Sequence, residues 1–110
     1  MTVITVEDKY VETLGAFENL QTAVNTALQR YTIEQITTKI NDLRARASQY
    51  QQKYALDYVN FSQRTAEDED FVRHIEDNVS KTWEVDLADW EFCHKGIQDW
   101  TRKLESILLT

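Results

Sequence analysis

The sequence predicts a mainly α-helical protein built as a long antiparallel helical hairpin, preceded by a short N-terminal strand. The 110 residues include no proline and only two glycines, the residue types that most often interrupt helices. In two long stretches, apolar residues recur at alternating spacings of three and four, which is typical of helices that pack face to face. The two stretches are similar in length, so one can cover the other.

Length and composition limit the architecture. A chain of 110 residues is the size of one domain, with residues 1–32 expected to form a strand-helix-helix dimerisation region continuous with a helical hairpin of residues 33–110. No apolar run approaches the roughly 18 residues that span a bilayer, and no signal-peptide pattern is present. We therefore expect a cytoplasmic protein without membrane association. The single cysteine, Cys93, agrees with a reducing compartment.

The net charge of −7 is unevenly distributed. Residues 1–64 carry seven acidic and seven basic residues, so the whole imbalance lies from residue 65 onward, with twelve acidic and five basic residues. An acidic half repels a phosphate backbone and attracts a basic partner. A solvated surface that keeps the protein soluble is the alternative explanation.

The first element is a run of β-branched residues, Thr-Val-Ile-Thr-Val at positions 2–6. Such residues favour a strand. A single short strand is not stable alone, and no second convincing strand follows. The predicted partner is therefore the same strand of a second subunit, related by a two-fold axis. A frayed terminus is the alternative.

Two helices are expected next. Asp8 is the predicted N-cap of a short helix over residues 9–14, which Gly15 would end in the left-handed conformation. Asn19 is the predicted N-cap of a long helix over residues 20–61. The first apolar face of this long helix contains Leu20, Val24, Ala27, Leu28 and Tyr31.

The order strand, short helix, glycine turn and helix, with Thr-Val-Ile-Thr-Val at the start and Ala-Leu-Gln-Arg-Tyr at positions 27–31, resembles the N-terminal region of ribbon-helix-helix antitoxins. These are the small partner proteins of prokaryotic toxin-antitoxin pairs. The resemblance covers about the first third of the chain and implies a ribbon-helix-helix-like homodimer. In that family two strands pair across the dimer and insert into the DNA major groove, where alternate residues read bases.

The resemblance and the uncovered start of the long helix together predict the residues of the dimer core, which are Ile4, Val6, Val24, Leu28 and Tyr31. Val3, Thr5 and Glu7 would face DNA. However, Glu7 stands where the family usually has arginine or lysine, and Val3 offers no hydrogen bond. The dimerising role of the strand therefore fits this sequence better than the DNA-reading role.

From residue 33 the long helix carries a heptad seam formed by Ile33, Ile36, Ile40, Leu43, Ala47, Tyr50 and Tyr54. Tyr58 and Phe61 continue this aromatic end, and the helix is expected to break at residues 62–64. Basic residues follow its outer surface, where they are either solvated or close to the acidic C-terminal segment; they are Lys39, Arg44, Arg46 and Lys53.

The second half of the hairpin is predicted as two helices. Thr65 and Asp68 resemble a capping box, and the acidic residues 67–70 would lie in the first turn of a helix over residues 66–79. A last helix over residues 83–109 has the seam Trp83, Leu87, Trp90, His94, Ile97, Thr101, Leu104 and Leu108, with Val85, Phe92, Trp100 and Ile107 broadening its apolar arc. Both helices would run back along residues 20–61.

The candidate catalytic patterns are incomplete. Glu91 and His94 have the Glu-x-x-His spacing of di-iron proteins, which need the motif twice. Cys93 and His94 are sequence neighbours that point about 100° apart on a helix, so they do not face each other. The acid pairs 67/70 and 86/89 are similar to those that hold magnesium in all-helical nucleotide pyrophosphohydrolases, where several carboxylates converge. We expect no catalysis, no metal and no cofactor.

The leading interpretation is an antitoxin-like interaction protein, a homodimer that binds and neutralises a small basic toxin encoded nearby. The acidic C-terminal half would bind this partner through Glu67, Asp68, Asp70, Asp86, Asp89 and Trp100. A helical scaffold or DNA-binding regulatory dimer without a toxin is the first alternative. An all-helical magnesium-dependent nucleotide hydrolase is the second.

Overall fold

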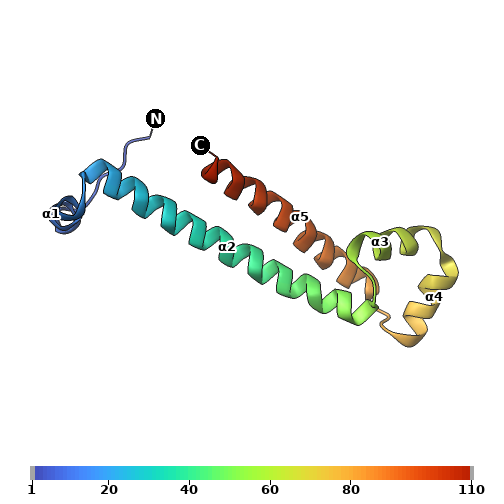
Figure 1. Cartoon of the computed structure of the whole chain (residues 1–110). Helices are drawn as coiled ribbons and strands as arrows, with labels where there is room; N and C mark the ends of the chain where they lie inside the picture. Colours follow the sequence, from blue (N-terminus) through green and yellow to red (C-terminus); the bar gives the residue numbers. More distant parts are fainter. Residues whose placement is uncertain (1, 110) are drawn as a thin grey trace. The chain divides into compact units, whose positions relative to one another are not determined.

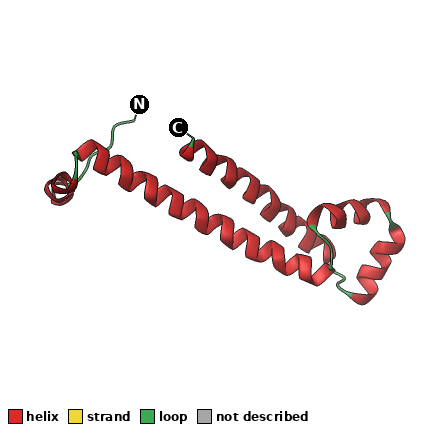
Figure 2. Ribbon diagram, in the orientation of Figure 1, coloured by secondary structure: helices red, strands yellow, loops and turns green. Residues whose placement is uncertain are grey.

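The computed structural model describes residues 2–109 of the chain. Over this range the chain is mainly helical, as predicted, and contains no strand (Figures 1 and 2). The helices are α1 (Asp8–Phe17), α2 (Leu20–Tyr54), α3 (Tyr58–Glu67), α4 (Glu69–Asn78) and α5 (Trp83–Leu108). The chain divides into two compact units, Met1–Gln35 and Ile36–Thr110, and residues of α2 belong to both.

Residues 2–7 form neither helix nor strand. The strand predicted at positions 2–6 is therefore absent from the described chain. The physical reason is that β-branched residues favour extended backbone, but a strand also needs a neighbouring strand to bond with. Residues 2–109 provide no such neighbour. Pairing with a second subunit stays a prediction.

The first helix starts and ends differently from the prediction. Glu7, not Asp8, is its N-cap, and Asp8 lies in the first turn. The helix continues through Gly15, whose φ is not positive, and stops at Phe17. A glycine in a helix interior costs only about 1 kcal/mol relative to alanine, so it need not end the helix. The predicted cap of α2 is confirmed, because Asn19 Oδ1 accepts hydrogen bonds from the backbone N–H of Gln21 at 3.0 Å and of Thr22 at 3.3 Å.

The long helix ends at Tyr54, seven residues before the predicted end at Phe61. Ala55 takes a left-handed conformation with φ of 58°. Asp57 then caps α3 by accepting a hydrogen bond from the backbone N–H of Asn60 at 2.8 Å. Apolar spacing continues unchanged across this turn, so periodicity alone does not reveal it.

The predicted break at residues 62–64 therefore lies inside α3, and the chain turns around Asp68 instead. Asp68 accepts a hydrogen bond from the backbone N–H of Phe71 at 3.1 Å and caps α4. Thr65 does not take part in a capping box, because its hydroxyl donates to the carbonyl of Phe61 at 2.9 Å. The prediction of acidic residues in a first turn is confirmed for Glu69 and Asp70.

In the unit Ile36–Thr110, α5 lies antiparallel to the end of α2, and its predicted start at residue 83 is confirmed. The ammonium group of Lys53, near the end of α2, donates a hydrogen bond to Asp86 near the start of α5. Gly96 lies later in α5 and approaches Leu43, which lies earlier in α2, so the two helices run in opposite directions. A Cβ atom at Gly96 would lie 2.8 Å from Leu43 Cδ1, so this glycine permits a close approach of the helices. Four seam residues of α2 are buried, namely Ile36, Ile40, Leu43 and Tyr54.

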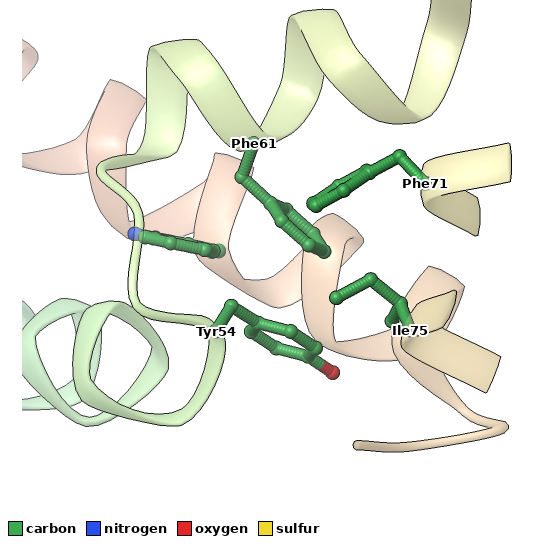
Figure 3. Close-up of a cluster of buried hydrophobic side chains, with 5 residues drawn as sticks. Tyr54, Phe61, Phe71 and Ile75 are labelled. Carbon is green, nitrogen blue, oxygen red and sulfur yellow. The ribbon is translucent and has the colours of Figure 1, made fainter. Parts of the chain in front are cut away.

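The helices α3 and α4 do not extend the hairpin as predicted, since α4 packs on α3 and α3 packs on α5. They close a cluster of buried side chains formed by Tyr54, Phe61, Phe71, Ile75 and Trp90. Figure 3 shows the labelled members pointing toward one another from α2, α3 and α4. The ring of Phe61 is fully buried, with its centroid 4.4 Å from that of Tyr54 and 5.5 Å from that of Trp90. Truncating such a side chain to alanine costs about 3–5 kcal/mol.

The left-handed residue that ends α2 yields a stability prediction. Ala55→Gly is expected to raise the free energy of unfolding by about 1 kcal/mol, because glycine takes a positive φ without the steric cost that a Cβ atom brings. The control Ala45→Gly, at an exposed position in the interior of α2, is expected to lower it by about 1 kcal/mol. Urea denaturation followed by tryptophan fluorescence measures both. Equal destabilisation by the two variants would contradict a left-handed turn at position 55.

Candidate functional site

An acidic corner forms where α3 meets α4, among residues predicted to bind a partner. Glu67 is the exposed last residue of α3. Glu69 and Asp70 follow in the first turn of α4, with side chains 93% and 92% exposed. Their nearest cation is Arg73, whose guanidinium nitrogens lie 3.8 Å from each carboxylate. Because exposed ion pairs at such distances contribute little, these carboxylates are available to an incoming cation.

Asp68 belongs to the same corner, but its carboxylate is used to cap a helix. Its Oδ1 caps α4, as described above, and its Oδ2 lies 3.8 Å from the guanidinium of Arg64. Arg64 in turn lies over the ring of Phe71, 4.0 Å from the centroid. Asp68 therefore joins the surface to the buried cluster.

Asp86 and Asp89, also predicted to bind a partner, are engaged within the chain. Asp86 accepts hydrogen bonds from the ammonium of Lys53 at 2.7 Å and from the hydroxyl of Tyr54 at 2.5 Å. Asp89 pairs with Arg46 and accepts a hydrogen bond from the hydroxyl of Tyr50 at 2.6 Å. These contacts form a polar ladder between α2 and α5, which consists of Arg46, Tyr50, Lys53, Tyr54, Asp86 and Asp89.

The polar ladder changes the pKa values of Tyr50, Tyr54 and Asp86. The hydrogen bond to Asp89, followed by burial, raises the pKa of Tyr50 to about 12. Burial, followed by the hydrogen bond to Asp86, raises the pKa of Tyr54 well above its usual range. Burial alone would raise the pKa of Asp86, but the hydrogen bonds from Lys53 and Tyr54 outweigh it and the pKa is lowered. The ladder therefore favours neutral hydroxyls on Tyr50 and Tyr54 and an ionised Asp86.

Trp100, also predicted to bind a partner, is half-buried on α5. The ammonium of Lys103 lies over its ring, 4.3 Å from the centroid. A partner that contacts this ring must therefore displace the Lys103 side chain, which is a cation–π contact of modest strength.

Four of the five predicted dimerisation residues are brought together in the first part of the chain. Ile4 and Val6 of the N-terminal segment and Val24 and Leu28 of α2 line one groove of about 860 Å³, in which Val3 also takes part. Tyr31, the fifth predicted residue, is 64% exposed and does not line the groove.

Of the residues predicted to face DNA, Val3, Thr5 and Glu7 are all exposed. The carboxylate of Glu7 lies 3.4 Å from the ammonium of Lys9. An acidic side chain at this position would face the phosphates unfavourably, so the contacts seen here add nothing in favour of DNA reading.

The residues considered for catalysis each have another contact. Glu91 pairs with Lys95 at 2.7 Å, and the ring of His94 stacks on that of Tyr58 with centroids 4.6 Å apart. Cys93 is fully buried, and burial raises the pKa of its thiol. Among residues 2–109, no group of three or more His, Cys, Asp or Glu side chains is placed to hold a metal ion.

Sequence reasoning left open that basic residues of the long helix lie close to the acidic C-terminal segment, which is confirmed for Arg46 and Lys53, but it missed the tyrosine hydroxyls of the ladder, although two signals pointed to them. Tyr50 and Tyr54 occupy seam positions, and a buried tyrosine hydroxyl needs a hydrogen-bond partner. Asp86 and Asp89 lie on the facing helix and could have been matched to them. Gly96, in the middle of a helix, was the corresponding signal for close helix packing.

Comparisons of the chain with protein-family models, with curated proteins and with solved structures found no match. The resemblance to ribbon-helix-helix antitoxins therefore rests on the short N-terminal motifs alone. None of the helices in the described range has the length and apolar character needed to cross a membrane.

The raised pKa of Tyr50 predicts an alkaline effect on stability. A folded pKa above the unfolded one means that the stabilisation is complete below about pH 10 and is lost as the pH rises through 10 toward 12. In an absorbance titration of phenolate formation, Tyr50→Phe is expected to remove one tyrosine from those that ionise only above about pH 10, which we call the late phase. The loss of folding stability at alkaline pH is expected to become smaller in the same variant. The same titration in denaturant is the control, because unfolding removes the hydrogen bond to Asp89. An unchanged late phase in Tyr50→Phe would contradict the ladder geometry.

Proposed function

We propose that this chain is a protein-binding module without catalytic function, an antitoxin-like protein that binds a small basic toxin at its acidic corner and neutralises it by occlusion. The observation that carries the proposal is the near-complete exposure of the Glu69 and Asp70 carboxylates. Exposed like charges gathered on one surface attract a cationic protein and orient it before contact.

The acidic corner rests on a rigid base. Phe61 of α3 and Phe71 of α4, the two helices that meet at the corner, pack edge to face with centroids 6.0 Å apart. Asp68 fixes the turn between the helices through its cap. A surface held in this way binds with little loss of conformational freedom, which favours affinity.

The acidic surface continues along α4. This helix contains four acidic residues and one arginine, and Glu76 and Asp77 are both exposed at its second half. In contrast, Asp86 and Asp89 would have to break their bonds in the polar ladder before contacting a partner. The proposed contact surface is therefore α4 and the end of α3, with a smaller role for α5 than the sequence suggested.

Charge reversal tests this surface. Glu69→Lys combined with Asp70→Lys is expected to lower the affinity for the small basic product of the adjacent gene by about tenfold, because it removes the electrostatic attraction. The control is Glu12→Lys combined with Glu18→Lys, which changes the net charge equally at exposed positions of the first unit. Co-expression followed by pull-down and titration measures both. Equal losses, or the lack of any small companion gene in several genomes, would refute the proposal.

We also propose that the protein acts as a homodimer joined through its N-terminal region. Leu28 is 49% exposed on α2 and lines the apolar groove. Leu28→Asp is expected to make the protein monomeric, since it places a charge in an apolar contact. Gln29→Asp, one residue further on the exposed side of the same helix, is the matched control and should remain dimeric. Sedimentation analysis of both variants decides, and a dimeric Leu28→Asp protein would place the dimer contact elsewhere.

A further inference from the structure

The unit Met1–Gln35 has almost no core of its own. Among its described residues only Ala23 is buried. Its large apolar side chains are exposed instead, including Val3 (91%), Ile4 (69%), Phe17 (80%) and Tyr31 (64%). A segment of fewer than about 40 residues cannot bury enough apolar surface to be stable without an additional partner. Exposure on this scale indicates an interaction surface.

The surface has a regular centre on α2. Leu20, Val24 and Leu28 follow one another at spacings of four and form a single ridge on the helix. Ile33, where the heptad seam begins, lies nine residues after Val24 and therefore on the opposite side of the helix at 100° per residue. The ridge is thus a separate apolar surface and not a continuation of the seam.

We propose that a second copy of this chain covers the ridge, with the two α2 helices packed antiparallel and crossing at Val24. In this arrangement Val24 meets the partner's Val24, and Leu20 meets the partner's Leu28. The inference rests on the homodimer of the proposed function and specifies its contact: the dimer core is made by helix faces, and strand pairing is not required.

The buried area fits a dimer. Taking about 200 Å² for a large side chain when fully exposed, the exposed large apolar side chains of this unit offer roughly 900 Å² per copy, comparable to the about 800 Å² per partner of a standard interface. Two such units together have about 70 residues, which is enough for one shared core.

The chemistry of the surface favours a second copy over a basic partner. No charged residue lines the groove beside the ridge, and its polar positions are neutral, namely Thr2, Asn19, Gln21 and Asn25. Two copies can therefore meet here without repulsion, although the chain carries a net charge of −7. A basic partner would find no carboxylate within the groove. The ridge is also symmetric about Val24, so it is complementary to itself under a two-fold axis.

The position of Arg30 favours the antiparallel direction. This residue is exposed and makes no ion pair within residues 2–109. A parallel pair would set the two Arg30 side chains at the same level. An antiparallel pair centred on Val24 separates them by twelve residues, or about 18 Å of helix, which exceeds the Debye length of about 10 Å at 0.1 M salt.

Cysteine cross-linking tests the direction of packing. When Leu20→Cys and Leu28→Cys proteins are mixed under mild oxidation, we expect disulfide-linked heterodimers in severalfold excess over homodimers, because only the mixed pair brings the two Cα atoms within about 7 Å. The unmodified chain is the control, since its Cys93 is fully buried. Leu20→Cys that links to itself as readily as to Leu28→Cys, or no linkage at all, would overturn the inference.

A second variant separates helix packing from strand pairing. Thr5→Pro removes a backbone N–H that a two-stranded ribbon would use, but it leaves the ridge of α2 unchanged. We expect the dimer dissociation constant of Thr5→Pro, measured by sedimentation, to lie within about twofold of that of the unmodified protein. A monomeric Thr5→Pro protein would overturn the helix-packed dimer. Neither readout involves the toxin, so a failure of partner binding and a failure of this inference are distinguishable.

Discussion

The ring of Phe61 is surrounded by side chains from α2, α4 and α5, and the rest of the unit Ile36–Thr110 depends on this packing. Because α2 stops at Tyr54 and α3 leaves in a new direction, Phe61 can enter the space at the end of the hairpin. The same ring fixes α3 relative to α4, which positions the acidic corner. The surface proposed for partner binding is therefore a direct consequence of a buried aromatic contact.

The polar ladder has a different role from the aromatic cluster. Its ion pairs are partly exposed, and such pairs contribute about 0–1 kcal/mol each. Their effect is on register, because Tyr50 and Tyr54 bury their rings and need acceptors at fixed heights on the facing helix. Sliding α5 by one turn would separate Asp86 and Asp89 from these hydroxyls and would also move Gly96 away from Leu43. Hydrogen bonds and close packing thus select the same alignment.

The two units differ in how they satisfy their apolar residues. Residues 36–110 have an aromatic core within one chain, whereas among the described residues of the first unit only Ala23 is buried. This contrast suggests a division of tasks under the proposed function: self-association through the neutral ridge of α2, and partner binding through the charged corner of α4. The uneven charge of the sequence follows the same division, since the acidic excess lies after residue 64.

The sequence by itself determined the helical class, the cap at Asn19, the heptad seam and the start of the last helix, because these depend on local spacing and on residues close in the chain. It did not determine where the long helix ends. Ala55 carries no stop signal, yet it takes a left-handed conformation directly after Tyr54, whose ring packs on that of Phe61. Tertiary structure also decided which acidic residues are exposed. Asp86 and Asp89 lie opposite two tyrosines and accept their hydrogen bonds, whereas Glu69 and Asp70 remain in solvent. Such differences depend on contacts between residues more than thirty positions apart, which no local pattern contains.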